Sequence, residues 1–142
     1  MQKIEDVILF QVDLTSKISK HYSQREFDKQ QMGITVEQWI ILKIISESSA
    51  LSQKELANKS YRDPASITRT INLLEKKELV RRKDVPSNKR MYNIALTKQG
   101  SAFVQNHMSI VEAHRKKSID GISEEELAQL GRLLDKIRQN MS

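Results

Sequence analysis

The fold of this 142-residue chain is decided by one stretch, Leu51 to Gly100, which reads LSQKELANKSYRDPASITRTINLLEKKELVRRKDVPSNKRMYNIALTKQG. Ser52 and Glu55 have the spacing of a capping box, which predicts the start of a short helix. Asp63 followed by Pro64 is typical of the N-cap and first residue of a second helix. Two short helices joined by a turn of a few residues indicate a helix-turn-helix.

A basic β-hairpin is predicted directly after the second helix. Residues 80–84 and the alternating residues 91–96 have the pattern of two strands. The intervening residues 85–90, VPSNKR, supply turn-forming proline, serine and asparagine, and end on two cations. A helix-turn-helix followed by such a hairpin is a winged helix, with a wing of two or three strands.

Long amphipathic helices flank this region. Before it, apolar residues recur at three- and four-residue steps and predict one helix over the first 30 residues, ended by Gly33. Thr35 and Gln38 form a second capping box, which opens an apolar helix expected in the core. After it, Thr97 is a candidate cap for a helix closed near Gly121.

The last helix is predicted from a third capping box, Ser123 with Glu126, and from a stripe of bulky side chains. These stripe residues are Leu127, Leu130, Leu134, Ile137 and Met141. The two terminal segments have more apolar surface than one small domain uses, so we expect them to form a homodimer. The predicted fold class is mainly α with a small β-hairpin wing. Residues 35–98 form the DNA-binding lobe, and residues 1–34 and 99–142 supply dimerisation helices.

The positive charge of the chain is concentrated in its middle third. The net charge is +6, yet residues 52–98 contain twelve Lys or Arg against five acidic residues, while the flanks are slightly acidic. A basic region inside a winged helix indicates a polyanionic partner, with a solvated basic surface as the alternative.

Composition excludes several classes of function. The chain has no cysteine, which excludes disulfides, cysteine metal sites and thiol chemistry. It has only four scattered glycines, so no glycine-rich phosphate-binding loop is available. No apolar run has the length of a membrane span, and the N-terminus lacks the features of a secretory signal. We therefore expect a cytoplasmic protein that is not an enzyme and has no cofactor or metal.

Along essentially its whole length, and most clearly from Leu51 to Gly100, the chain resembles the MarR family of winged-helix transcription regulators. The segment SITRTINLLEKKELVRR is similar to the recognition helix and first wing strand of that family, and ALTKQG to its second wing strand. The resemblance implies a homodimer of triangular shape, a wing that enters the minor groove, and repression relieved by a small anion, often phenolic.

Two positions depart from the family pattern. The wing tip usually reads Asp-Arg-Arg, and this chain has Asn88, Lys89 and Arg90 there. Asn88 lacks the charge with which an aspartate would pair with a neighbouring arginine. The family's turn glycine before the first wing strand is replaced by Glu78.

The candidate DNA contacts come from three elements, and their chemistry suits different parts of a duplex. Polar and guanidinium side chains near the start of the recognition helix suit bases or phosphates, the wing cations suit the narrow minor groove, and the start of the preceding helix suits backbone phosphate. For Arg69 and Asn72, which of guanine, adenine or phosphate is contacted stays open. The predicted DNA-binding residues are Gln53, Lys54, Arg62, Ser66, Thr68, Arg69, Asn72, Asn88, Lys89 and Arg90.

Two further kinds of site have candidate residues, an effector pocket and a metal site. His21, Tyr22, Arg25 and Trp39 are candidates for the effector pocket that the resemblance implies, with ordinary packing as the alternative. His107 and His114 share one helical face, but they lack the clustered carboxylates of a metal site.

These observations favour a double-stranded DNA-binding regulator, a dimeric repressor of a pseudo-palindromic operator. The alternative is a small helical protein-interaction adaptor with a basic docking face. An enzyme whose site does not show in the sequence is a third reading. Specific duplex binding with a steep dependence on salt separates the regulator from both.

Overall fold

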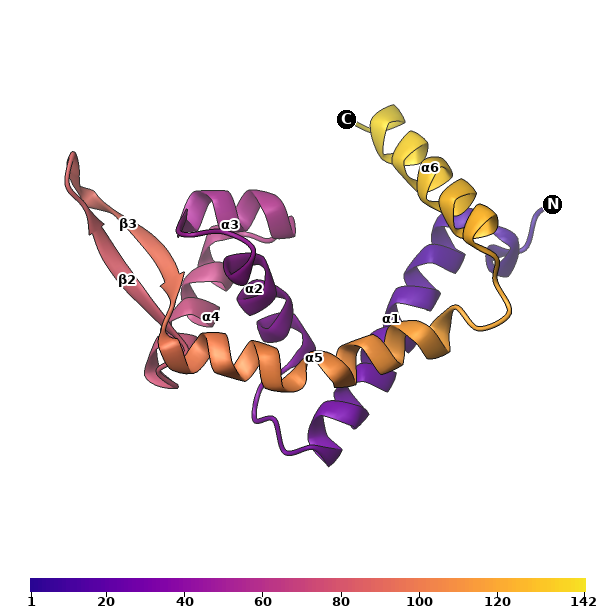
Figure 1. Ribbon diagram of the computed structural model, residues 1–142. Coiled ribbons are helices and arrows are strands. Elements are labelled where there is room, and N and C mark those ends of the chain that lie inside the picture. Colours follow the sequence, from indigo (N-terminus) through magenta and orange to yellow (C-terminus); the bar gives the residue numbers. More distant parts are fainter. The chain divides into compact units, whose positions relative to one another are not determined.

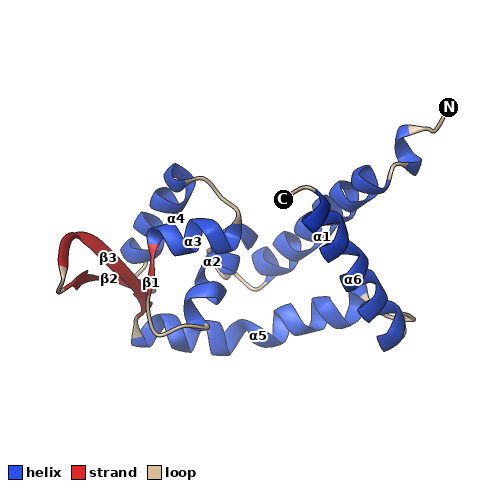
Figure 2. Ribbon diagram, turned by 90° about the horizontal axis from the view of Figure 1, so that it is seen from above, coloured by secondary structure: helices blue, strands red, loops and turns tan.

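The computed structural model describes the backbone of residues 1–142 and all side chains except those of residues 88–91. The chain is mainly helical with one small sheet (Figures 1 and 2). Its elements, in order, are η1 (Ile4–Asp6), α1 (Ile8–Lys29), α2 (Val36–Ser46), β1 (Leu51–Ser52), α3 (Gln53–Ser60), α4 (Pro64–Lys76), β2 (Val80–Val85), β3 (Asn88–Leu96), α5 (Lys98–Ser118) and α6 (Glu124–Asn140). The predicted fold class is confirmed.

The chain divides into two compact units, residues 1–110 and residues 111–142, with the boundary inside α5. The division expected from the sequence, a lobe of residues 35–98 and two dimerisation segments, concerns roles and stays a prediction. None of the helices in the described part of the chain is long and apolar enough to cross a membrane.

All three predicted capping boxes are present. Thr35 Oγ1 accepts from the Gln38 N–H at 3.2 Å, and the Thr35 N–H donates to Gln38 Oε1 at 2.9 Å. The boxes of Ser52 at α3 and of Ser123 at α6 have the same reciprocal bonds. Each box satisfies backbone N–H groups that a helix start otherwise leaves without a partner, so these helices begin where the local sequence places them.

The N-terminal helix is interrupted, which corrects the prediction of one continuous helix. Val7 is extended, with φ −73° and ψ 123°, and separates the 3-10 turn η1 from α1. At the other end, Gly33 adopts φ +75°, a conformation that favours glycine, and the chain turns there towards α2.

The core of the first unit lies among α2, α3, α4 and the sheet. Its completely buried side chains are Ile41, Leu42, Ile45, Leu56, Ile67, Ile71, Leu74 and Ile94. Because these residues come from α2, α3, α4 and β3, burying them fixes α3, α4 and the sheet against α2.

The sheet has three antiparallel strands in the order β1-β3-β2 (Figure 2). Ile94 of β3 pairs with Leu51 on one side and with Arg82 on the other. The hairpin turn is only Pro86 and Ser87, because β3 begins at Asn88. Residues 88–90 therefore belong to a strand, which corrects their assignment to the turn.

The wing is attached at its base to the start of α5. Glu78 has φ +64°, so it takes the left-handed conformation of the turn glycine that it replaces. Thr97 Oγ1 donates to Glu78 O at 2.6 Å, and the Thr97 N–H donates to Leu79 O at 3.1 Å. The Gly100 N–H in turn donates to Thr97 Oγ1 at 2.9 Å, which caps α5 as predicted. These bonds fix the point where the hairpin leaves the helices.

Candidate nucleic-acid interface

The recognition helix α4 has a polar capped start. Asp63 Oδ1 accepts from the Ser66 N–H at 2.8 Å, and Pro64 occupies the first turn, as the sequence predicts. The Ser66 N–H bond, aided by the charges of Arg69 and Arg62, lowers the pKa of the Asp63 carboxyl below its ordinary value. Asp63 is therefore ionised at neutral pH and stabilises the positive end of the helix dipole.

The turn before α4 holds an inward-facing arginine. Arg62 Nη2 donates to Ser66 Oγ, and Arg62 Nη1 is buried without a hydrogen-bond partner among the described residues. Tyr61, which ends α3 with φ +52°, is 98% exposed beside it. The Arg62 guanidinium thus holds the turn, and its contact with DNA stays a prediction.

Ser66 requires a correction. The sequence placed it on the outer face of α4, but it is only 9% exposed. Its backbone N–H bonds Asp63, and its hydroxyl faces Arg62, so it belongs to the cap rather than to the outer surface. The exposed face of α4 instead carries Thr68, Arg69 and Asn72.

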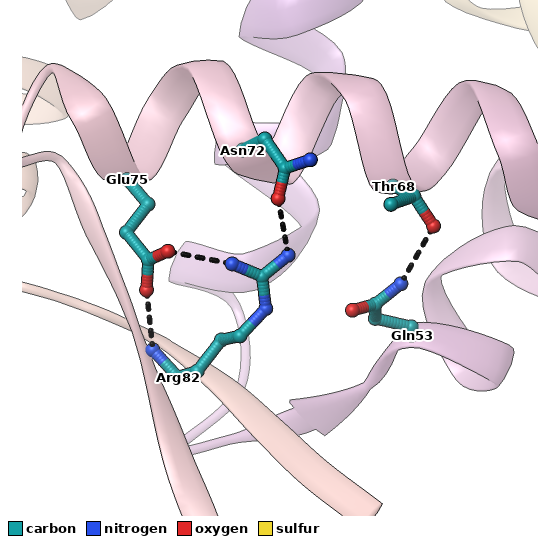
Figure 3. Close-up of polar contacts among 5 residues, drawn as sticks. All are labelled: Gln53, Thr68, Asn72, Glu75 and Arg82. Carbon is teal, nitrogen blue, oxygen red and sulfur yellow. Dashed lines mark hydrogen bonds and ion pairs between the residues drawn. The ribbon is translucent and has the colours of Figure 1, made fainter.

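Two of these candidates are linked across the helix-turn-helix. Gln53 Nε2, at the start of α3, donates to Thr68 Oγ1 at 3.1 Å (Figure 3). Thr68 Oγ1 also donates to Pro64 O at 3.0 Å, so the hydroxyl is used both as donor and as acceptor. The bond fixes the start of α3 relative to α4 and reduces what Thr68 can offer to a ligand.

A second link joins α4 to the wing, and the sequence did not predict it. Arg82 of β2 donates from Nη1 to Glu75 Oε1 at 2.6 Å and from Nη2 to Asn72 Oδ1 at 2.7 Å (Figure 3). The Arg82 backbone N–H donates to Glu75 Oε2 at 3.4 Å. The only sequence signal is that Glu75 and Arg82 have opposite charges on either side of a short turn, which does not fix a pairing.

Two candidate cations keep their charges available. Lys54 on α3 and Arg69 on α4 are exposed, and within the part of the chain whose side chains are described neither has a hydrogen bond or ion pair. Exposed cations near the start of a recognition helix suit phosphate or a base edge.

The wing candidates Asn88, Lys89 and Arg90 lie outside the described side chains. Their backbone begins β3, with Asn88 paired to Val85 across the turn. Their contacts with DNA stay predictions.

The effector-pocket candidates come from two helices, α1 and α2. Trp39 is 4% exposed and packs in the core, with its ring centroid 6.1 Å from that of Phe27 and 6.5 Å from that of Phe103. On α1, His21 is exposed, and the Arg25 guanidinium lies 5.9 Å from the centre of the Tyr22 ring. These contacts are those of a packed core residue for Trp39, and a role of all four residues in an effector pocket stays a prediction.

His107, one of the two histidines that share a face of α5, has contacts within its own helix. His107 Nδ1 lies 2.7 Å from Phe103 O, and the two rings are 4.2 Å apart. Among the described residues, no group of three or more His, Asp or Glu side chains has the arrangement of a metal site.

The chain is similar to known proteins both in sequence and in fold. Residues 34–92, which span α2 to the start of β3, match the model of the MarR family. A MarR/EmrR family transcriptional regulator from Acinetobacter sp. ADP1 superposes with a TM-score of 0.89 at 24% identity, covering 99% of this chain and 98% of that one.

Two further solved structures have the same fold. AbsC, a MarR family transcriptional regulator from Streptomyces coelicolor, gives a TM-score of 0.86 at 21% identity over 99% of this chain and 97% of its own. CouR from Rhodococcus jostii RHA1, bound to p-coumaroyl-CoA, gives a TM-score of 0.84 at 22% identity, covering 96% of this chain and 95% of its own. At these identities the likeness establishes the fold of the chain.

Proposed function

We propose, from the premise that the winged-helix region of this chain belongs to the MarR family, that the protein is a sequence-specific double-stranded DNA-binding regulator. The observation that carries the proposal is a capped recognition helix whose exposed face is polar and basic, fixed by hydrogen bonds to α3 on one side and to the wing on the other. A helix presented in this way suits the major groove.

We assign the contacts to two sets of residues. Lys54, Arg69 and Asn72, with Lys89 and Arg90 of the wing, contact the duplex. Gln53, Arg62, Ser66 and Thr68 support the recognition helix through the bonds described above. The reason for this assignment is that the contacting residues of α3 and α4 are exposed and still have hydrogen-bonding capacity, whereas the supporting residues already use theirs within the protein.

The regulator acts as a homodimer that reads a pseudo-palindromic operator. The apolar residues Ile4, Ile8 and Ile18 are 66%, 56% and 61% exposed, and Leu130 of α6 is 52% exposed. Apolar surface of this extent in a single chain supports coverage by a second copy. Sedimentation at micromolar concentration should give twice the mass of 16.4 kDa, and a persistent monomer would contradict this part of the proposal.

Repression relieved by a small organic anion is the mode of control we propose. The support is that the similar protein CouR is bound to p-coumaroyl-CoA in its solved structure. A thermal shift and loss of operator binding with a phenolic carboxylate would test it.

The deciding experiment is selection of bound duplexes from a randomised pool, followed by a salt titration. We expect an imperfect palindrome with half-sites about 10 bp apart and a steep fall of affinity with salt. Arg69→Ala should weaken operator binding by about 1 to 3 kcal/mol if Arg69 contacts a base. Binding to acidic proteins without selection of any duplex would favour the adaptor instead.

A further inference from the structure

The link between β2 and α4 determines how one side chain of the recognition helix is oriented. Arg82 contacts Asn72 at 2.7 Å and Glu75 at 2.6 Å from adjacent guanidinium nitrogens. The Arg82 side chain is only 21% exposed, so its charge is partly shielded from water. A charge-assisted pair of bonds with this geometry fixes both partners more firmly than one surface contact does.

The chemistry of arginine fixes which end of the Asn72 amide faces it. Guanidinium groups only donate hydrogen bonds, so the atom of Asn72 that receives the bond is the carbonyl oxygen. The amide nitrogen then lies on the other side, and Figure 3 shows it directed away from Arg82. Asn72 is exposed, so its two N–H donors are available on the outer face of α4.

This orientation changes what Asn72 can read. An unrestrained asparagine recognises adenine by accepting from N6 and donating to N7, which requires both amide ends on the DNA side. With its oxygen turned to Arg82, Asn72 presents donors only. Guanine is the base that offers two acceptors, N7 and O6, in the major groove.

We propose that Arg82 is a positioning residue that makes Asn72 a donor-only reader, so that α4 prefers guanine over adenine at one position of each half-site. The inference rests on the proposed function, because it requires α4 to lie in the major groove. The same pairing neutralises Glu75, whose unpaired carboxylate on this surface would repel phosphate.

The test compares base preferences of four variants in the randomised-duplex selection. Arg82→Ala frees the Asn72 oxygen, and Arg82→Lys keeps the charge but loses the planar fork that reaches two acceptors. Asn72→Asp keeps an acceptor for Arg82 and removes the outward donors. Lys83→Ala is the matched control, because Lys83 is the exposed neighbour in β2 and has no hydrogen bond or ion pair among the described side chains.

We expect the parent and Lys83→Ala to select guanine at the same position. Both Arg82 variants should shift the base preference at that position towards adenine. In Asn72→Asp, the preference for guanine at that position should fall by about tenfold, while the preferences at the other positions stay the same. Circular dichroism shows whether each variant keeps its fold, and sedimentation shows whether it keeps the oligomeric state of the parent. If Arg82→Ala is unstable, Arg82→Lys alone decides.

Two results would overturn the inference. One is an unchanged preference in a folded Arg82 variant, which would show that Asn72 is not positioned by Arg82. The other is equal weakening of Asn72→Asp on all sequences, which would assign Asn72 to a phosphate. A parent protein that selects no sequence at all would instead overturn the proposed function, and the two failures are thereby distinguished.

Discussion

The winged helix and the last helix of the chain are built from similar local signals but bury their apolar residues to very different extents. Both α3 and α6 begin with a capping box. Yet Leu56 of α3 is completely buried, whereas α6 has no buried residue and its Leu130 is 52% exposed. Helix boundaries are therefore local properties, while the stability of a helix depends on what covers its apolar face.

The largest effect should come from the core of the winged helix. Ile71→Ala removes a completely buried side chain of α4 and should cost about 3 kcal/mol of unfolding free energy. Urea unfolding followed by circular dichroism measures this loss. The control is Leu130→Ala, whose cost should vary with protein concentration, because an exposed residue gains stability only from a partner copy. Equal, concentration-independent costs would break the comparison.

The substitution Gly100→Ala should have the next largest effect on stability. A Cβ at this position would lie 1.9 Å from Leu79 O, and the neighbour is backbone that moves only together with the base of the wing. Because the Leu79 backbone must be displaced, we expect the unfolding free energy to fall by about 2 kcal/mol, measured as a lower midpoint of thermal unfolding. Stability equal to that of the parent would show that the junction of α5 and the wing is loose.

Gly131→Ala should have the opposite sign. A Cβ at this helical glycine of α6 would have no atom within 4 Å other than those of the adjoining helix backbone, so alanine adds helix propensity without a clash. A gain of about 0.5 to 1 kcal/mol is expected, read from helicity and thermal unfolding of dilute protein. A loss that grows with protein concentration would place a partner helix against this position and sharpen the comparison.

The smallest effect concerns pH. Because the pKa of Asp63 is lower in the folded state, its contribution to stability is complete above the ordinary carboxyl pKa and is lost as the pH falls through the folded value. Asp63→Asn keeps a good N-cap but does not titrate. The parent should therefore lose stability relative to Asp63→Asn below about pH 4. If the acid-unfolding curves of the parent and of Asp63→Asn run parallel, the ionised Asp63 carboxylate does not contribute to stability in this way.

The sequence was sufficient for features that depend on neighbours three or four residues away. The capping boxes at Thr35, Ser52 and Ser123 are confirmed, as is the Asp63-Pro64 start of α4. The two-residue strand β1 is too short to show a period-two pattern, so only its pairing with β3 reveals it.

The candidate site was less predictable because its order comes from tertiary contacts. Helical spacing placed Ser66 outside, but Arg62 and Asp63 bind it at the cap. The contacts of Arg82 span seven and ten residues and depend on how β2 leaves α4. Periodicity identifies which residues share a face, but it does not determine which of them are already bonded to each other.

Strand β1 also has a consequence for cooperativity. Ser52 pairs with Asn93 in the sheet and caps α3 at the same time. Separating β1 from β3 would remove this pairing and weaken the start of α3, so partial opening loses both contributions together. The helix-turn-helix and the wing should consequently exchange their amide hydrogens as one cooperative unit, without an intermediate in which the wing alone is detached.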